Sequence, residues 1–300
     1  MTRVVSLLPA GTEIVAALGA LDRLVGVSHE CDYPAAVAGL PRVTASAVDG
    51  NATSRDIDAG VRRLMDAGRP VFALDAAQLA ALRPSLIITQ SLCDVCAVTD
   101  GDVRALGAVL DPAPALLPLS GTTLAGVWDD IAAVGGALGL EPAAAALLVS
   151  IQRRLRRVHD TLGSARAPRP RVVVIEWLDP LFVAGHWTPE LVKRAGGIDA
   201  LAAPGTHSVQ VDIARIRDAR PELVLFAPCG FDIVRSERES RALLATAAWA
   251  WVSELPAWAL DGNALTSRPG PRLADAVEAI AAIIAPSLFP APSRAYARRL

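Results

Sequence analysis

Short apolar runs alternate with helix-patterned segments along most of the chain. Uninterrupted apolar runs of this kind are typical of strands buried on both faces of a parallel sheet. They occupy 3–7, 24–27, 70–74, 85–89 and 113–119 in the first half, and 171–175 and 222–226 in the second. Strands that alternate with helices predict an α/β fold with a parallel sheet in each half.

Helical spacing fills the segments between these runs. Thr12 is placed to cap a helix that ends at Gly19, and Thr188 to cap another that has Pro189 in its first turn. Further helices are predicted at 54–67, 76–82, 123–139, 212–219 and 236–247, with a last one that ends near residue 285.

One predicted helix, at residues 141–165, stands apart because of its length. It is rich in Ala and Leu, Pro142 suits its first turn, and Gly163 followed by Pro168 ends it. Its length would be about 30 Å at 1.5 Å per residue. We interpret it as a rigid strut that joins two lobes.

The two halves share short sequences, which indicates a weak two-fold duplication. RPSLII at 83–88 resembles RPELVL at 220–225, and TEIV before Gly19 resembles TPELV before Gly196. The first half has more residues between its two shared sequences than the second half has. We therefore expect an extra structural unit around 45–75. The predicted division is an N-terminal lobe at 1–122, connecting helices at 123–168, a C-terminal lobe at 169–285, and a loose tail rich in Pro and Arg at 286–300.

The charge and the hydropathy exclude some partners. Basic residues number 29 and acidic residues 31, which argues against nucleic acid. No apolar run approaches the ~20 residues that a membrane span needs, so no membrane insertion is predicted. The N-terminus superficially resembles a secretory signal, but Glu13 interrupts its apolar run and we interpret it as part of the fold. We therefore expect a cytoplasmic protein, with export through an upstream signal as the alternative.

The rarest residue types collect where the predicted strands end. In open parallel sheets, ligands bind at the carboxyl ends of the strands. Those ends hold all four cysteines, at 31, 93, 96 and 229, together with His29, His186, Tyr33, Trp177 and Trp187. This concentration predicts a binding site made of strand-end loops.

The cysteines and His186 leave several kinds of chemistry open. Cys93 and Cys96 form a CxxC, which could be a redox pair, half of a metal site, or small residues that line a ligand. A structural zinc site needs four ligands, so Cys31, Cys229 or a histidine would have to complete it. His186 could ligate cobalt, iron or zinc as neutral imidazole, or could simply bond to backbone where a helix begins.

Several motifs together resemble a known family. SLLPAGTEIVAALGALDRLVGVS followed by DYP, then GHWTPELVKRAGG and SRPGPRL, are similar to the cobalamin and iron-chelate periplasmic-binding-protein family, the substrate-binding partners of ABC importers. SHECDYP, QSLCDVCAV and GHW resemble a branch usually labelled cobalamin-binding protein. The resemblance covers about residues 3–285. It implies two Rossmann-like lobes joined by one long helix, the class III substrate-binding architecture.

The resemblance also implies positions for the ligand contacts. In the family the ligand lies in the cleft between the lobes, which points to Pro9, Ala10, Gly11, Tyr33 and Arg268 here. An aromatic residue expected after the first-lobe strand is replaced by Gln90. Trp177 and Trp187 would suit a large flat ligand, although packing in the core is the alternative. Cys93 and Cys229 would line the same loops.

Two functions of different classes follow. The first is a binding protein that holds a corrinoid or another large metal chelate, with the permease of an ABC importer as the partner that the resemblance implies. The second is a metal- or thiol-dependent cytoplasmic enzyme on the same fold. No catalytic triad order, P-loop or GxGxxG is present, and nothing in the sequence argues positively for catalysis.

Overall fold

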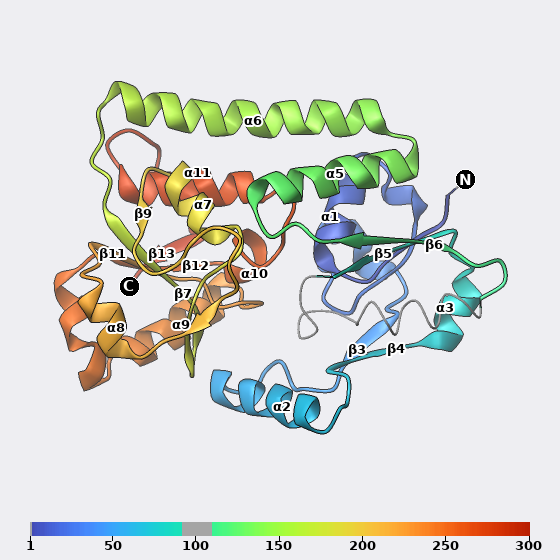
Figure 1. The fold of residues 1–300 in the computed structure, drawn as a ribbon, viewed down its shortest axis with the longest axis horizontal. Helices are drawn as coiled ribbons and strands as arrows, with labels where there is room; N and C mark the ends of the chain where they lie inside the picture. Colours follow the sequence, from blue (N-terminus) through green and yellow to red (C-terminus); the bar gives the residue numbers. More distant parts are fainter. Residues whose placement is uncertain (1, 92–109) are drawn as a thin grey trace. The chain divides into compact units, whose positions relative to one another are not determined.

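The computed structural model describes residues 2–91 and 110–300, and these residues divide into two compact units (Figure 1). The first unit comprises the chain up to Gly121 together with 125–149, and the second comprises 122–124 together with 150–300. Helix α6, Glu141–Ser164, begins in the first unit and ends in the second. The helix predicted at 141–165 is therefore present almost residue for residue.

The first unit is built on a parallel four-stranded sheet with the order β2-β1-β5-β6. Its strands are β1 Val4–Ser6, β2 Leu24–Val27, β5 Leu86–Gln90 and β6 Ala115–Leu119. The connecting helices are α1 Pro9–Ala17, α3 Ala76–Leu82 and α5 Leu124–Leu138, with short 3₁₀ turns at Leu21–Arg23 and Ala35–Gly39. Helix α1 begins at Pro9 and not after Thr12, because proline is well tolerated in the first turn of a helix.

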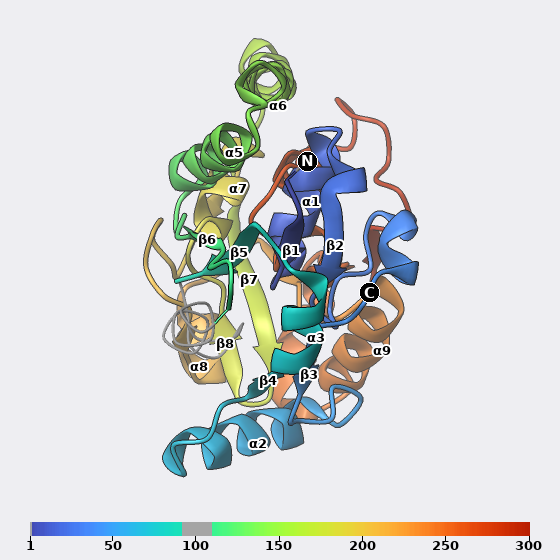
Figure 2. The same cartoon turned by 90° about the vertical axis from the view of Figure 1, so that its right-hand side faces the viewer.

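The extra unit predicted around 45–75 is present as a small hairpin-like addition. Strands β3, Thr44–Ser46, and β4, Phe72–Leu74, pair antiparallel, and α2, Ser54–Asp66, lies in the connection between them. Figure 2 shows α2 beside this strand pair. The Thr53 side chain caps α2 by accepting a hydrogen bond from the Asp56 amide.

The second unit has a mixed sheet with a parallel centre and antiparallel edges. Its order is β10-β8-β7-β11-β12-β13, and β9 pairs with β7 outside this path. The strands are β7 Arg171–Leu178, β8 Leu181–Val183, β9 Ile198–Asp199, β10 Val209–Gln210, β11 Leu223–Phe226, β12 Ala257–Leu260 and β13 Ala297–Arg299. The helices are α7 Thr188–Arg194, α8 Ile213–Asp218, α9 Ile233–Leu244, α10 Gly262–Leu265 and α11 Leu273–Ile284, with a 3₁₀ segment at Ala247–Glu254. Strands β7 and β11 are parallel, as predicted, and β12, which the sequence did not predict, pairs parallel with β11. Strands β8, β10 and β13 run antiparallel to their neighbours.

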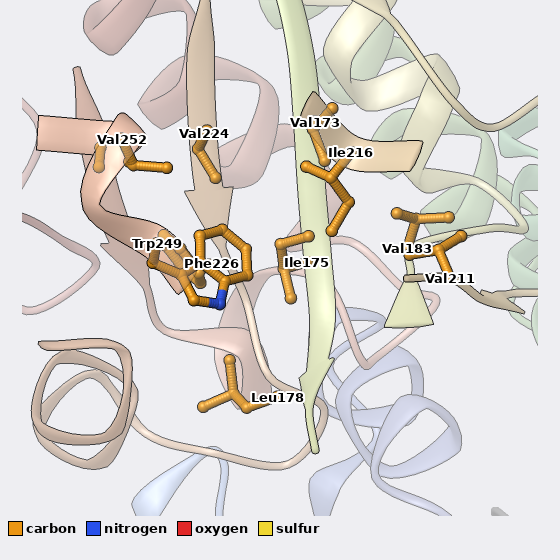
Figure 3. Close-up of a cluster of buried hydrophobic side chains, with 11 residues drawn as sticks. Val173, Ile175, Leu178, Val183, Val211, Ile216, Val224, Phe226, Trp249 and Val252 are labelled. Atoms are coloured by element: carbon orange, nitrogen blue, oxygen red, sulfur yellow. The ribbon is translucent and has the colours of Figure 1, made fainter. Parts of the chain in front are cut away.

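The core of the second unit lies over β7 and β11 (Figure 3). Phe226 and Trp249 face each other with their ring centroids 5.5 Å apart, and both are buried. Trp251 stacks on Trp249 at 6.1 Å. Both of these tryptophans, in the 3₁₀ segment after α9, therefore serve the core.

The C-terminal residues correct one expectation. We expect 286–300 to be loose because it is rich in Pro and Arg, yet β13 pairs with β12. The Leu300 amide also donates to the Ala257 carbonyl at 3.0 Å. Arg298 also donates to Glu237 of α9 at 2.8 Å. The physical reason is that β12 offers an open edge, whose unpaired backbone groups a further strand satisfies.

The duplication seen in the sequence recurs in backbone detail. Arg83 and Arg220, which begin the two related sequences, both adopt the left-handed conformation, with φ of 46° and 47°. Ser85 donates its amide to the Arg3 carbonyl at 2.9 Å, and Glu222 donates its amide to the Arg171 carbonyl at 2.8 Å. Each half thus joins a helix to its next strand in the same way.

Within the described parts of the chain, no helix is both long enough and apolar enough to cross a membrane.

Candidate functional site: strand-end loops of the two units

The SHECDYP loop after β2 is fixed to its neighbours by hydrogen bonds. Ser28 donates its amide to the Ser6 carbonyl at 2.8 Å, and the Arg42 guanidinium donates to the carbonyls of Ser28 and Cys31 at 3.1 and 2.6 Å. His29 Nδ1 lies 2.7 Å from the Thr44 hydroxyl. The pKa of His29 is lowered, first by burial and then by the charge of Arg42. His29 is therefore a structural residue of this loop.

Tyr33 is held at the end of this loop and is the exposed aromatic residue of the first unit's candidate site. Its exposed fraction is 48%, which is unusual for a large side chain. The hydrogen bonds of Ser28 and Cys31 fix the backbone from which it projects. A ligand could therefore cover the Tyr33 ring without first displacing core residues.

The Pro9-Ala10-Gly11 turn follows β1, as the resemblance requires, and forms the first turn of α1. Ala10 and Gly11 are buried. A Cβ on Gly11 would lie 2.8 Å from Ile88 Cγ2 and 2.8 Å from Ser6 Oγ, so this glycine lets α1 approach the sheet closely. Packing alone accounts for Gly11, while a ligand role for the turn stays a prediction.

The two cysteines that the structure describes belong to different units. Cys31 is buried in the first unit, with its sulfur 3.1 Å from the Thr12 hydroxyl, and Cys229 is exposed in the second. Gln90, at the end of β5, is 9% exposed. Cys93 and Cys96 lie outside the described residues, so the redox, metal and lining interpretations of the CxxC stay predictions. Among the residues that are described, no group of three or more His, Cys, Asp or Glu could hold a metal ion.

Loops after β7, β11 and β12 meet in the second unit. The Cys229 amide donates to the Glu176 carbonyl at 2.9 Å, which ties the loop after β11 to β7. The Asn263 amide donates to the Phe231 carbonyl at 3.0 Å, and the Gly230 amide to the Ser267 hydroxyl at 3.1 Å. These bonds build a continuous surface from segments far apart in the sequence, which is where the parallel-sheet rule places a ligand.

The two tryptophans predicted here have different surroundings. Trp177 is half-buried and packs against Phe231, with ring centroids 5.4 Å apart, and the Arg235 guanidinium lies 3.6 Å from the Phe231 ring centre. Trp187 is only 8% exposed, and its indole nitrogen donates to the Thr266 carbonyl at 2.8 Å. Trp177 can therefore present a ring face to a ligand, whereas Trp187 is mainly an anchor between loops.

Arg268 is 3% exposed, and its guanidinium donates to the Asn263 side chain at 2.7 Å. In this arrangement the guanidinium stiffens the loop that follows α10. A direct contact with a ligand would need that side chain to be uncovered, so the ligand role of Arg268 stays a prediction.

His186 has the most unusual backbone of the predicted site residues. Its φ is 51°, in the left-handed region that non-glycine residues seldom adopt. Its Nε2 lies 3.2 Å from Nδ1 of His207, and the rings meet edge to face. The pKa of His186 is lowered, first by burial and then by the charge of His207.

Sequence reasoning missed His207 and Phe231 as neighbours of the predicted site. His207, in PGTHS, is expected to face solvent, and it is exposed, but it also contacts His186. The available signal was that each histidine lies within two residues of a glycine, in GHW and GTHS. Only the fold could show that these two segments lie together.

The class of protein follows from a comparison with protein families. A sequence profile described as "Periplasmic binding protein" matches residues 4–253, most of the chain and parts of both units. The chain belongs to the periplasmic binding protein family. Its two α/β units joined by one long helix agree with that assignment.

Individual relatives are distant but cover nearly the whole chain. A vitamin B12-binding protein of Vibrio cholerae is 24% identical over 285 residues, which are 93% of this chain and 87% of the relative. A periplasmic heme-binding protein from Pseudomonas aeruginosa has the same fold, with a TM-score of 0.74, 23% identity, and coverage of 98% and 96% of the two chains. An ABC transporter substrate-binding protein from Listeria monocytogenes also shares the fold, with a TM-score of 0.70, 16% identity, and coverage of 94% and 98%.

Proposed function

We propose that this protein binds a large metal-containing tetrapyrrole through its strand-end loops, with a corrinoid as the first candidate and heme as the second. The observation that carries the proposal is the relationship over nearly the whole chain to a vitamin B12-binding protein, together with a shared fold with a heme-binding protein. Both ligands are wide, flat rings around a metal ion. A chain related to binders of both is best suited to that ligand class.

The aromatic residues of the loops support the same ligand class. Exposed Tyr33 in the first unit and half-buried Trp177 in the second offer ring faces, and flat macrocycles gain dispersion and hydrophobic contact from such rings. The loops that carry them are fixed by backbone hydrogen bonds, so little conformational entropy is lost when a ligand binds.

Titration followed by absorbance tests the proposal, because the visible bands of cobalamins and of hemin shift when their surroundings change. We expect saturable binding of one of them, and binding weakened by about tenfold, or 1.4 kcal/mol, in Tyr33→Ala and in Trp177→Ala. Trp251→Phe, in the core of the second unit, is the matched control and should bind like wild type. Absence of saturable binding by both ligands would remove the proposal.

We further propose that, if the protein is exported, it delivers its ligand to the permease of an ABC importer. If the protein stays in the cytoplasm, we propose that it stores the ligand there. The shared fold with an ABC transporter substrate-binding protein supports the first role. Cell fractionation followed by cross-linking separates the two roles. An importer role requires the protein outside the cytoplasmic membrane and cross-linked to a permease, whereas a storage role requires it in the cytoplasmic fraction.

A further inference from the structure

We infer that His186 and His207 form a two-histidine binding site for a divalent transition-metal ion such as Ni²⁺, Cu²⁺ or Zn²⁺. The two ring nitrogens that face each other, Nε2 of His186 and Nδ1 of His207, are 3.2 Å apart. Both residues belong to the second unit, so the site needs no contribution from the first. The inference goes beyond the proposed tetrapyrrole ligand, because it concerns a metal ion alone.

The backbone around the two histidines is built to bring them together. The His186 amide donates to the Thr206 carbonyl at 2.6 Å, and the Gly205 amide donates back to the His186 carbonyl at 2.9 Å. The Gly185 amide donates to the Ser208 hydroxyl at 3.2 Å. Three hydrogen bonds therefore hold the segment 185–186 against the segment 205–208.

Two costly features of the same segment favour a specific purpose over chance contact. His186 adopts the left-handed conformation without being glycine, which costs free energy that the surrounding structure must offset. Gly185 has no room for a side chain, because a Cβ there would lie 2.4 Å from the Thr206 carbonyl oxygen. Both features place the His186 ring beside His207.

The nitrogen separation matches the geometry of metal coordination. Zinc–imidazole bonds are about 2.0–2.1 Å long, so two nitrogens on one tetrahedral ion lie about 3.3 Å apart. A metal ion could therefore bind both nitrogens at close to their present 3.2 Å separation. The imidazole that donates in the present contact would first move its proton to its other ring nitrogen, so that each ring offers a lone pair to the ion. Water would complete the coordination, since His207 is exposed.

The chemistry of imidazole decides which ions the site takes. Neutral imidazole is a good ligand for Zn²⁺, Ni²⁺ and Cu²⁺, whereas Mg²⁺ and Ca²⁺ prefer oxygen. Among the divalent ions, Cu²⁺ should bind most tightly by the general order of affinities. Among the described residues, no third His, Cys, Asp or Glu joins these two histidines in a group that could hold a metal ion. With only two protein ligands, the affinity for the ion should be moderate.

Calorimetric titration with Ni²⁺ tests the inference directly. The protein is prepared without a histidine tag and without tetrapyrrole, and its cysteines are alkylated so that thiols cannot bind the ion. We expect one ion per chain, and binding weakened by about tenfold or more in each of His186→Asn and His207→Ala. Asn is chosen at position 186 because it tolerates the left-handed backbone.

A matched control and a second readout make the test decisive. His159→Ala removes an exposed histidine of α6 and should leave Ni²⁺ binding unchanged. Pulsed electron paramagnetic resonance with Cu²⁺ should detect two coordinated imidazoles in the wild type and one in each variant. Wild-type affinity in His207→Ala, or a single imidazole in the folded wild type, would overturn the two-histidine site even if tetrapyrrole binding is confirmed.

Discussion

Gly185 illustrates how one residue can set the geometry of a site. Its missing side chain lets the segment 206–208 cross directly over it, and that crossing places His207 beside His186. The sequence shows a glycine next to a histidine and a tryptophan, but it does not show what approaches the glycine. The close approach explains why a glycine, and no larger residue, fits there.

Gly185→Ala should lower the free energy of unfolding by about 1–3 kcal/mol, because the new methyl group must push the crossing segment away. Gly136→Ala is the matched control. Gly136 is an exposed residue of α5 whose added Cβ would meet nothing within 4 Å. That control should gain roughly 0.5–1 kcal/mol, since alanine favours helix more than glycine does. Urea denaturation of both variants measures the two changes, and equal effects would contradict the packing argument.

Helices α6 and α11 are linked in the second unit by a cluster of ion pairs. Arg154 of α6 donates to Asp275 and to both carboxylate oxygens of Glu278, the latter at 3.0 and 2.6 Å. Arg157 donates to Glu278 at 2.9 Å. The pKa of Glu278 is lowered from its ordinary value of 4.5, mainly by the hydrogen bond from Arg154.

The lowered pKa of Glu278 makes part of the stability depend on pH. A carboxyl group whose pKa is lower in the folded state stabilises the fold above its unfolded pKa, and this stabilisation is lost as the pH falls through the folded pKa. Glu278→Gln should therefore cost about 1 kcal/mol near neutral pH and progressively less below about pH 4.5. Thermal unfolding between pH 3 and pH 7 measures this loss of stability, and Glu254→Gln, at an exposed residue, is the control. If the loss of stability in Glu278→Gln did not depend on pH, the ion-pair explanation would be wrong.

The antiparallel strand β13 completes the sheet of the second unit. Leu300 also packs against the core of that unit. Deletion of residues 297–300 should lower the free energy of unfolding by about 2 kcal/mol, because it removes backbone hydrogen bonds and uncovers the edge of β12. Arg294→Ala, an exposed residue just before the strand, should have little effect. If the deletion proved neutral by thermal unfolding, β13 would contribute nothing to stability.

Strands and long helices could be predicted at the scale of elements, while sheet edges could not. Strands β5 and β11, which overlap the runs predicted at 85–89 and 222–226, are buried along their whole length, as their apolar composition predicts. Strand β13, with sequence ARR, has no apolar pattern, and it forms because β12 leaves an edge beside it. Pairing of that kind depends on a partner that is remote in the sequence.

At the scale of the whole molecule, each of the two units carries its own sheet and its own strand-end loops. Tyr33 belongs to the first unit and Trp177 to the second. Each unit therefore offers one aromatic ring to the proposed ligand. Its effect on stability should depend on residues of each unit.

Saturating tetrapyrrole should raise the unfolding temperature of the wild type, because a ligand that binds only the folded state stabilises it by about 2.7 kcal/mol at 100 times its Kd. Tyr33→Ala and Trp177→Ala should each reduce this rise at the same ligand concentration. Differential scanning calorimetry with and without ligand checks both variants. A rise reduced by only one of them would confine the binding site to a single unit.

The sequence by itself determined the α/β class, the long helix α6, the extra unit around α2 and the strand-end loops, because each depends on local composition and periodicity. It also marked His186, Tyr33 and Trp177 as residues to test. Only the tertiary structure decided that Trp187 is an anchor, that Arg268 is buried, and that the C-terminus forms a strand. The pairing of His186 with His207 belongs to the same group, since contacts between distant segments are fixed by packing and not by local pattern.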